Sequence, residues 1–348
     1  MGAATMHSAA TMHNAEAIVV GGGPAGSAAA ARLRAAGVDV LVLDKEEFPR
    51  QKLCAGWITP EVVRDLSLDI AAYPHGFLSF RRLHWHIRGL RLPVPCVQHS
   101  IRRFEFDAWL LERSGAPVVR HNVREIARDG EYYVLDDAFR CRYLVGAAGT
   151  SCPVRRALFE PSLPRARGLQ TATLELEFPY DWRDPDCHLW FFDHGLPGYS
   201  WYVPKASGWL NVGVGGMATR LKQRGENIRQ HWQHLAAKIR RDFGIPIPGE
   251  PKGYSYYVRG PLPARIGNAF LAGDSAGLAT RDLCEGIGPA IRSGERAAKS
   301  ITTGAPYDLD DVTGGSLGGG VLTRWMDWAF TRGVNRAPLV KNLASKSA

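Results

Sequence analysis

The chain has 348 residues, of which 45% are hydrophobic and 22% charged, a composition typical of a folded globular protein with about two domains. This composition excludes a largely disordered or fibrous protein. The formal net charge of +9 favours an anionic partner, such as a phosphorylated ligand, an acidic lipid surface or a nucleic acid, without choosing among them.

The cysteines and the N-terminal residues indicate where the protein works. Its six cysteines form no C-x-x-C pair and match no zinc-binding spacing, which favours a reducing, cytosolic setting over a disulfide framework. Residues 1–14 lack the basic and apolar regions of a signal peptide, and we interpret them as a disordered tail. No apolar run approaches the ~18 residues of a membrane span. We therefore expect a cytoplasmic protein, with contact at the inner membrane surface as an open alternative.

Predicted helices and strands alternate at both ends of the chain. A strand at 15–20, a helix at 24–36 and a strand at 38–43 form a βαβ start. The predicted elements that follow are a strand-like stretch at 78–97, a helix at 103–114, strands at 118–123, 132–135, 139–145, 174–178, 188–192, 200–203 and 209–214, a helix at 227–243, a strand at 270–272 and a helix at 289–301. A hinge at 313–320 precedes a last predicted helix. This order predicts one nucleotide-binding layer built from distant segments, with a strand-rich sheet inserted to cover the ligand.

A glycine-rich turn lies between the first predicted strand and helix. Gly21, Gly23 and Gly26 form the pattern G-x-G-x-x-G, which allows a tight turn, backbone approach to a pyrophosphate and close helix packing. The amide groups that begin the helix would face the phosphates. Asp44 follows the second strand, where a carboxylate can accept hydrogen bonds from ribose hydroxyls. Together these features predict a dinucleotide cofactor, either NAD or FAD.

Two later turns favour FAD. A short apolar strand ends at Gly273 and Asp274, an acid that can hold the ribitol of a flavin. The turn at Gly149 follows another predicted strand and is succeeded by Arg155 and Arg156, so it offers a further phosphate-facing segment. Each turn is a weak signal alone, and their order along the chain predicts a flavin site.

These segments together resemble the flavoproteins of the geranylgeranyl reductase family, within the group similar to p-hydroxybenzoate hydroxylase. Residues 49–56 resemble the family's P-R-x-K-x-C-G-G segment, with Ala55 in place of a glycine. Residues 103–107 resemble its R-x-x-F-D helix start, whose arginine lies near the cofactor. The D-G-x-x-S-x-x-R motif is matched in part, because Ala148 stands where the acid is usual. Residues 284–287 resemble G-E-G-I, with a cysteine in place of the first glycine.

The most specific match is Y-x-W-x-V-P at residues 199–204, followed after eight residues by Gly213 and Gly215. The family has Y-x-W-x-F-P and then G-x-G. In that family the motif lines the cavity for the hydrocarbon part of the substrate. The resemblance covers most of residues 15–301 and is thin from about residue 305 onward.

The resemblance and the order of elements imply an α/β fold. We expect a Rossmann-like FAD-binding domain of the GR2 type, an inserted antiparallel β-sheet substrate domain and a short helical C-terminus. The expected parts are a tail at 1–14, a discontinuous FAD-binding domain at 15–75, 98–165 and 260–305, a substrate-binding domain at 76–97 and 166–259, and a C-terminal segment at 306–348.

The resemblance also implies an FAD-dependent oxidoreductase that reduces carbon–carbon double bonds of an isoprenoid or other hydrophobic substrate, by hydride transfer from flavin N5. The expected catalytic set is Cys54 near the flavin, with Tyr199 and Trp201 as walls of an apolar slot. A buried small hydrophobe and ordinary strand packing are the competing interpretations of these residues. No metal site is expected. The residues expected to contact FAD are Gly21, Gly23, Pro24, Ala25, Gly26, Asp44, Lys45, Lys52, Cys54, Ala55, Arg103, Ala148, Gly149, Gly273, Asp274, Gly286 and Ile287.

The expected partners follow from the same likeness. The substrate is a hydrophobic small molecule, with an isoprenoid diphosphate as one candidate. Because no second glycine fingerprint is present, electrons would come from an external donor: NAD(P)H that docks transiently, ferredoxin or another reductase. Peripheral membrane contact is a further expectation. No basic–aromatic module supports nucleic-acid binding.

Two other functions stay open on the sequence. A flavin-dependent monooxygenase or halogenase that uses oxygen shares the same FAD frame, although a halogenase would carry W-x-W-x-I-P where this chain has Tyr199 and Val203. An electron-transfer flavoprotein without an organic substrate would usually add a ferredoxin-like cysteine cluster, which this chain lacks.

Overall fold

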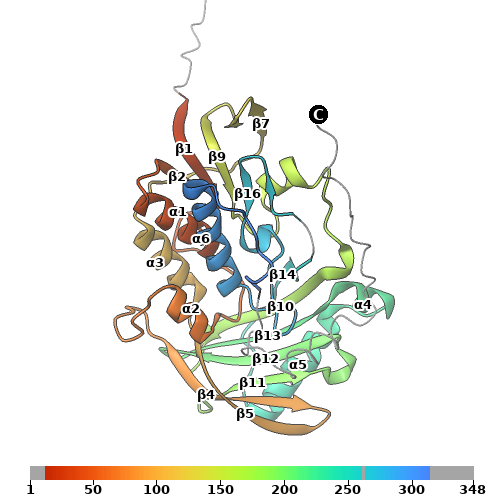
Figure 1. The fold of residues 1–348 in the computed structure, drawn as a ribbon. Coiled ribbons are helices and arrows are strands. Elements are labelled where there is room, and N and C mark those ends of the chain that lie inside the picture. Colours follow the sequence, from red (N-terminus) through yellow and green to blue (C-terminus); the bar gives the residue numbers. More distant parts are fainter. Residues whose placement is uncertain (1–11, 261–262, 314–348) are drawn as a thin grey trace, which may run out of the picture.

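Two β-sheets organise the chain, and each collects strands from distant parts of the sequence (Figure 1). The computed structural model describes residues 12–260 and 263–313. Within these residues the first sheet has the order β15-β16-β9-β1-β2-β6, and β8 and β7 continue from β9. The second sheet has the order β14-β10-β13-β12-β11-β4-β5-β3. The mixed α/β, Rossmann-like fold predicted from the sequence is confirmed.

The first sheet grows from the predicted βαβ start. Its strands are β1 (His13–Val20), β2 (Val40–Asp44), β6 (Val118–Arg120), β7 (Ile126–Asp129), β8 (Tyr132–Leu135), β9 (Phe139–Gly146), β15 (Arg265–Ile266) and β16 (Ala269–Leu271). β1 pairs in parallel with β2 on one side and β9 on the other. It begins earlier than predicted, because His13 and Asn14 pair with Phe139 and Arg140. The assignment of these two residues to a tail at 1–14 was therefore wrong.

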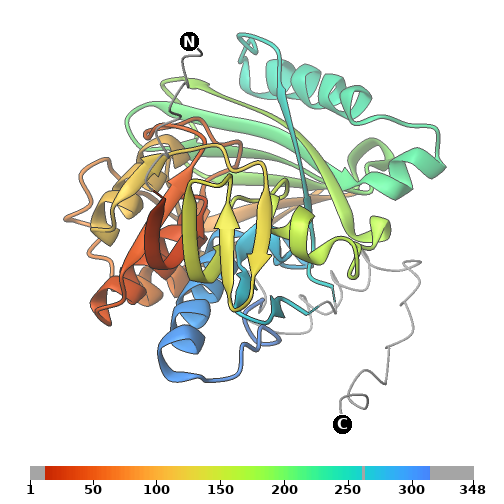
Figure 2. The ribbon, with the colours of Figure 1, turned by 90° about the horizontal axis from the view of Figure 1, so that it is seen from above.

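Helices cover one face of the first sheet. They are α1 (Pro24–Ala35), α3 (Arg103–Ser114) and α6 (Ile287–Thr303). α1 and α6 pack very closely, because a Cβ at Gly294 would lie 2.1 Å from the carbonyl oxygen of Ala25. The opposite face carries Ile18 and Val20, which pack with residues of β8 and β9. Figure 2 looks onto this half of the molecule from above, with β7 and β8 in yellow.

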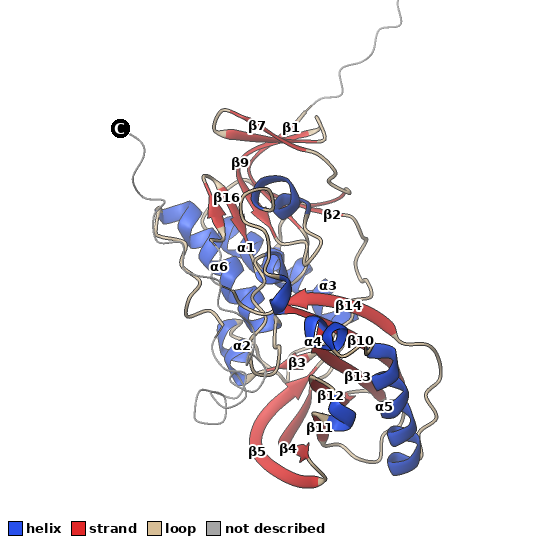
Figure 3. Ribbon diagram, turned by 90° about the vertical axis from the view of Figure 1, so that its right-hand side faces the viewer, coloured by secondary structure: helices blue, strands red, loops and turns tan. Residues whose placement is uncertain are grey.

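The second sheet is curved and has one helix-covered face (Figure 3). Its pairings are antiparallel, as predicted for the inserted sheet, except for β4 with β11, which is parallel. These two strands come from separate chain segments, so no hairpin forces them to be antiparallel. The strands are β3 (Trp57–Ile58), β4 (Leu78–Ile87), β5 (Leu90–Ser100), β10 (Gln170–Pro179), β11 (Cys187–Phe191), β12 (Gly198–Lys205), β13 (Trp209–Met217) and β14 (Lys252–Tyr257).

The helix on the second sheet is α5 (Ile228–Phe243), which follows the short α4 (Ala218–Gln223). Asn227 begins α5 with a capping box to Gln230, and Gly244 ends it in the left-handed conformation. Its apolar side chains pack against Leu210, Val212 and Val214 of β13. The other face of the sheet therefore faces the first half of the molecule.

Among the helices that the structure describes, we find no candidate for a membrane span.

Two segments that were expected in the FAD-binding domain add strand residues to the second sheet. β5 runs on to Ser100, and Trp57 and Ile58 pair with its last residues, so both segments contribute to the second sheet. Tyr307 donates a hydrogen bond to the carbonyl of Leu271 at 2.7 Å, which packs the start of the predicted C-terminal segment on the first half. The predicted helical C-terminus, and most of the hinge before it, lie outside the described residues.

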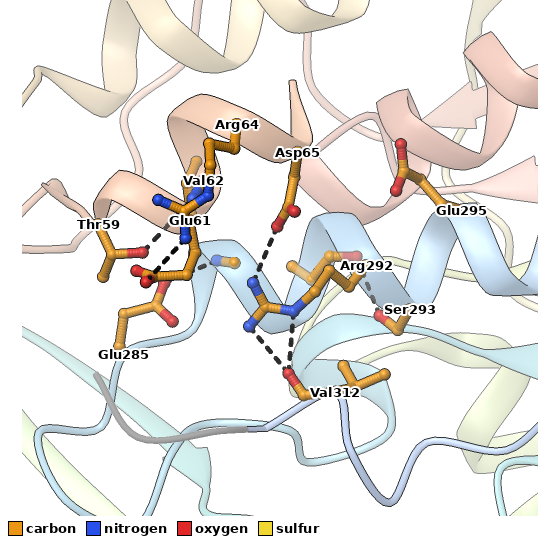
Figure 4. Close-up of polar contacts among 12 residues, drawn as sticks. Thr59, Glu61, Val62, Arg64, Asp65, Glu285, Arg292, Ser293, Glu295 and Val312 are labelled. Atoms are coloured by element: carbon orange, nitrogen blue, oxygen red, sulfur yellow. Dashed lines mark hydrogen bonds and ion pairs between the residues drawn. The ribbon is translucent and has the colours of Figure 1, made fainter. Parts of the chain in front are cut away.

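Arg292 links its own helix, α6, to two other segments of the chain (Figure 4). Its Nη1 lies 2.9 Å from the carboxylate of Asp65, at the end of α2 (Pro60–Asp65). Its Nε and Nη2 donate to the carbonyl of Val312 at 3.1 and 2.9 Å. α2 is thereby held against α6. On the outer side of α2, Arg64 makes a 3.0 Å ion pair with Glu61.

We expect Arg292→Ala to lower the free energy of unfolding by about 1–3 kcal/mol, because it leaves a carboxylate and a carbonyl without their donor. Arg64→Ala is the matched control: it removes an exposed ion pair on α2, the helix that carries Asp65, and should change stability by less than about 0.5 kcal/mol. Urea unfolding followed by circular dichroism measures both. Equal effects of the two substitutions would contradict this role of Arg292.

Candidate active site

A cavity of about 580 Å³ lies between the two sheets. It is lined by the turns that follow β1, β2, β9 and β16, at the carboxyl ends of the parallel strands, where α/β folds bind ligands. Strands β10, β12 and β14 of the second sheet supply the opposite wall. The predicted site residues that line it are Gly21, Gly23, Pro24, Ala25, Asp44, Lys45, Lys52, Cys54, Ala55, Arg103, Ala148, Gly149, Tyr199, Trp201, Gly273, Asp274, Gly286 and Ile287.

The glycine turn forms a cradle that side chains would fill. Gly21 has a positive φ of 110°, and a Cβ there would lie 2.6 Å from the backbone of Ala147. Of the residues expected to contact FAD or to take part in catalysis, Gly26 alone does not line the cavity. A Cβ there would lie 1.8 Å from the carbonyl oxygen of Gly21, so Gly26 serves close packing. No side chain caps the start of α1 and its first turn has no acid, which leaves its amide groups available to an anion.

Asp44 holds the turn as well as facing the cavity. One carboxylate oxygen accepts a 2.7 Å hydrogen bond from the amide of Gly22, and the other accepts a 2.9 Å bond from the amide of Glu46. A carboxylate has about four acceptor positions, so capacity for ribose hydroxyls remains.

Two guanidinium groups lie near this cradle. The Arg103 side chain donates to both carboxylate oxygens of Asp107, at 2.6 and 2.7 Å. Arg50, which the sequence-based set omitted, lies 3.6 Å from the same carboxylate. Its Nη2 would be only 3.4 Å from a Cβ at Gly23, so it stands beside the glycine turn. With two guanidinium groups and one carboxylate, this corner suits a pyrophosphate.

Tyr254 of β14 reaches across from the second sheet to the turns of the first. Its hydroxyl lies 3.2 Å from the carboxylate of Asp274 and 3.3 Å from the hydroxyl of Thr150. The ammonium of Lys52 stands 3.4 Å above its ring centre. Tyr254 was not among the predicted site residues, because its own segment contains no motif that indicates contact with distant turns.

Of the two arginines that were expected to face a phosphate after Gly149, only one lies at the cavity. Arg155 does not line the cavity, because its guanidinium donates to Glu160 and to the carbonyl of Leu163. The placement of Arg155 on a phosphate-facing turn was therefore wrong, whereas Arg156 does line the cavity. Arg165, which was not predicted, donates to the carbonyl groups of Thr150 and Ser275 and so joins the two flavin turns.

The register of a hairpin explains the aromatic motif and its glycines. β12 and β13 are antiparallel, with Trp201 opposite Gly213 and Tyr199 opposite Gly215. A Cβ at Gly213 would lie 2.2 Å from the Trp201 ring, so only glycine lets the indole lie flat on the sheet. The indole N–H donates to Asn211 at 2.7 Å. Strand packing and cavity lining are thus both true of these aromatic residues.

Tyr199 and Cys54 make backbone contacts at the cavity. The Tyr199 hydroxyl donates to the carbonyl of Leu283, and burial raises the pKa of Tyr199 well above its ordinary value. The Cys54 sulfur accepts a 3.3 Å bond from the amide of Gly56, and its carbonyl accepts a 3.4 Å bond from Asn211. Tyr199 therefore acts as a wall that stays protonated, and Cys54 belongs to a loop fastened to the second sheet.

A buried acid that the sequence did not reveal faces the cavity from β10. Glu175 is 4% exposed, and burial raises its pKa to about 7, an effect that Lys205 opposes and Glu177 reinforces. Burial acts on Glu177 in the same direction, but the ammonium of Lys205 and the guanidinium of Arg102 lower its pKa below the ordinary value. Lys205 is fully buried and lies 2.9 Å from Glu177. Glu175 is therefore the member of this group that still carries a proton part of the time near neutral pH, whereas Glu177 is ionised.

Glu285 is a second buried acid at the cavity. Its carboxylate accepts a 2.6 Å hydrogen bond from the amide of Gly288, in the first turn of α6. Burial raises the pKa of Glu285 to about 7, although this hydrogen bond and Arg292 lower it. The Glu285 carboxylate thus caps the start of α6, whereas Glu175 lies on β10 of the second sheet, near the aromatic side chains.

Comparison with known proteins identifies the family. Residues 19–86 match the NAD(P)-binding Rossmann-like domain. An uncharacterized protein of Methanosarcina barkeri is 30% identical, over 86% of this chain and 78% of its own. The menaquinone reductase of Mycolicibacterium smegmatis is 28% identical (86% and 79%), and the geranylgeranyl diphosphate reductase of Rhodobacter capsulatus is 27% identical (84% and 78%).

The chain belongs to the geranylgeranyl reductase family of flavoproteins. It is an FAD-dependent oxidoreductase, and the glycine cradle, the free amide groups of α1 and the two nearby guanidinium groups fit that cofactor. A solved geranylgeranyl bacteriochlorophyll reductase-like protein of Thermoplasma acidophilum has a TM-score of 0.72 at 21% identity, covering 84% of this chain and 79% of its own. A flavin-dependent brominase has a TM-score of 0.67 at 19% identity, covering 91% and 83%. These two likenesses show the shared fold.

We expect Arg50→Met to weaken FAD binding at least about tenfold, because a charge-assisted contact is worth about 1.5–3 kcal/mol. Arg34→Met removes the same charge from the opposite end of α1 and should leave the affinity unchanged. Titration of the apoprotein with FAD, followed by quenching of flavin fluorescence, measures both dissociation constants. Equal affinities for the Arg50 variant and the unmodified chain would exclude this contact.

Proposed function

We propose that this chain reduces a carbon–carbon double bond of a substrate with an isoprenoid chain. One observation carries the proposal: beyond the cofactor turns, the cavity continues into an aromatic slot that holds a single sheet-borne acid, Glu175. Adding two hydrogens to an alkene needs a hydride, a proton and a dry place for the hydrocarbon. The described residues offer the last two.

The lining of the slot suits a hydrocarbon. The slot is lined by side chains of the second sheet and of the loop before α6: Trp57, Leu189, Tyr199, Trp201, Val203 and Leu283. They offer dispersion contacts and exclude water from the reacting carbons. Menaquinone and geranylgeranyl diphosphate, which name two of the relatives, both carry an isoprenoid chain. This shared chain supports the substrate class and leaves the head group of the substrate undecided.

Each group of residues has one task in this proposal. When bound, reduced FAD supplies the hydride. The turns at Gly21–Gly26, Gly149 and Gly273 hold the cofactor, and Trp201 and Tyr199 orient the alkene. The Glu175 carboxyl gives its proton to the second alkene carbon. The carboxylate that results is attracted by Lys205 and takes a proton from water before the next turnover.

The neighbouring groups are less suited to give that proton. The Tyr199 hydroxyl donates to a backbone carbonyl, and its raised pKa makes it a poor acid. The Glu285 carboxyl is engaged by the amide groups at the start of α6. We assign Cys54 a positioning role, because its sulfur and carbonyl both accept backbone or amide bonds and the thiol lies close enough to interact with Arg103.

A direct experiment reduces the holoenzyme chemically without oxygen and then adds geranylgeranyl diphosphate or menaquinone. This makes the external electron donor, whether NAD(P)H, ferredoxin or another reductase, unnecessary. We expect the flavin absorbance to return and the product to carry two additional hydrogens. Reoxidation only by oxygen, with a hydroxylated or halogenated product, would show a monooxygenase or halogenase. Reoxidation by no organic compound at all would favour an electron-transfer flavoprotein.

In the same assay, Glu175→Gln should slow substrate-dependent reoxidation about 100-fold or more, because it removes the general acid. FAD affinity and chemical reduction should be unchanged. Glu250→Gln is the control, since its exposed carboxylate lies on the surface and pairs there with Arg229. A Glu175→Gln variant as fast as the unmodified enzyme would exclude Glu175 as the proton donor without excluding the reductase.

A further inference from the structure

Exposed hydrophobic side chains gather on one strand of the second sheet. Leu90, Leu92 and Val97 of β5 are 66%, 46% and 56% exposed, and Val94 and Cys96 between them are partly exposed. Single exposed leucines are ordinary in soluble proteins, but a row of them on one hairpin marks an interaction surface. The hairpin of β4 and β5 lies at the opposite end of the second sheet from β14 (Figure 3).

The chain segment that forms this hairpin carries only basic charge, although Asp186 from the segment before β11 pairs with His84 of β4. Residues 70–104 contain six arginines and no aspartate or glutamate. Arg81, Arg82 and Arg88 are exposed, and no ion pair involves them within the described part of the chain. Arginine binds phosphate groups well, and a basic residue near an anionic membrane surface is worth about 1 kcal/mol. The surface therefore combines apolar contact with attraction to phosphate.

A protein strand is a poor fit to the free edge of the hairpin. β3 pairs only with His99 and Ser100 of β5, so residues 90–98 form an outer edge in the described structure. Pro93 and Pro95 lie on this edge and have no N–H group to donate. Prolines at such positions block the addition of a further strand. The partner must therefore be recognised through side chains.

The apolar face of the hairpin is continuous with the cavity. Leu90, Leu92 and Val94 stand opposite Ile87, Trp85 and Leu83 of β4. These β4 side chains pack in the same cluster as Leu189, Trp201 and Leu283, which line the slot. A packed apolar cluster thus connects the exposed tip of the hairpin with the wall of the cavity.

We propose that the β4–β5 hairpin docks the enzyme on a membrane that contains anionic lipids. Leu90 and Leu92 enter the boundary between head groups and acyl chains, and Arg81, Arg82 and Arg88 contact lipid phosphates. Docking brings the slot next to the phase in which an isoprenoid lipid is dissolved. The lipid contact itself goes beyond the proposed function and does not require it.

The test is co-sedimentation of the holoenzyme with vesicles of phosphatidylcholine, with and without phosphatidylglycerol. We expect binding to the anionic vesicles. Leu90→Glu with Leu92→Glu should weaken it at least about tenfold, given the free energy of burying two leucine side chains. Replacing Arg81, Arg82 and Arg88 by Gln should remove the preference for phosphatidylglycerol. These variants must keep their FAD absorbance, and if the double variant loses it, the arginine variant and Leu90→Glu alone carry the test.

Val118→Glu with Val119→Glu is the matched control, because these two side chains are 44% and 37% exposed on β6 of the other sheet. The proposal is wrong if the enzyme ignores both kinds of vesicle or if the β6 variant weakens binding as much as the hairpin variant. It is also wrong if the hairpin substitutions convert a dimer to a monomer, since the surface would then bind a second copy. Flavin reoxidation by detergent-dissolved substrate should be equal in all variants, which separates failure of docking from failure of the proposed function.

Discussion

A single buried ammonium group, that of Lys205, determines how the two halves of the molecule meet. Its Nζ donates to the carbonyl of Ile101 at 2.7 Å, just before α3, and pairs with Glu177 of β10 at 2.9 Å. A Cβ at Gly56 would lie 2.4 Å from the same Nζ, so only glycine fits at the point where the loop that carries Cys54 passes Lys205. An unpaired buried charge is costly, so the contacts of Lys205 hold the loop, the helix start and the second sheet in one arrangement.

The same ammonium divides the roles of two neighbouring acids. Arg102 and Lys205 together satisfy Glu177, which keeps its charge, while Glu175 lies deeper and faces the cavity. Burial favours the protonated form of Glu175 and outweighs the opposing effects of Lys205 and of a hydrogen bond from the backbone of Cys54. The same ion pairs that stabilise the structure therefore leave Glu175 able to hold a proton beside the aromatic slot. The stability of the structure and the proposed chemistry therefore both depend on Lys205, Glu177 and Glu175.

Much of the site could be predicted because its signals are local. Three features can be recognised within a few residues each: the glycine turn at Gly21, the acid at the end of β2 and the aromatic motif. The spacing of the aromatic motif follows from the hairpin register, which places Trp201 opposite Gly213. Arg50, Tyr254 and Glu175 gave no such signal, since their roles arise from segments far apart in the chain. β7 was missed because Ile126–Asp129 has too little apolar character to predict a strand. The parallel pairing of β4 with β11 likewise depends on how the two halves assemble.

The central claim is that Glu175 titrates near neutral pH and so can still give a proton there. Infrared titration of the holoenzyme, with Glu175→Gln as the comparison, follows the carbonyl stretch of protonated carboxyl groups directly. The pKa is raised, so the group is protonated below about pH 7 and ionises above it. We predict a band that disappears with a midpoint near pH 7 and is reduced in the variant, where Glu285 still contributes. Identical titrations of the two proteins would contradict the account.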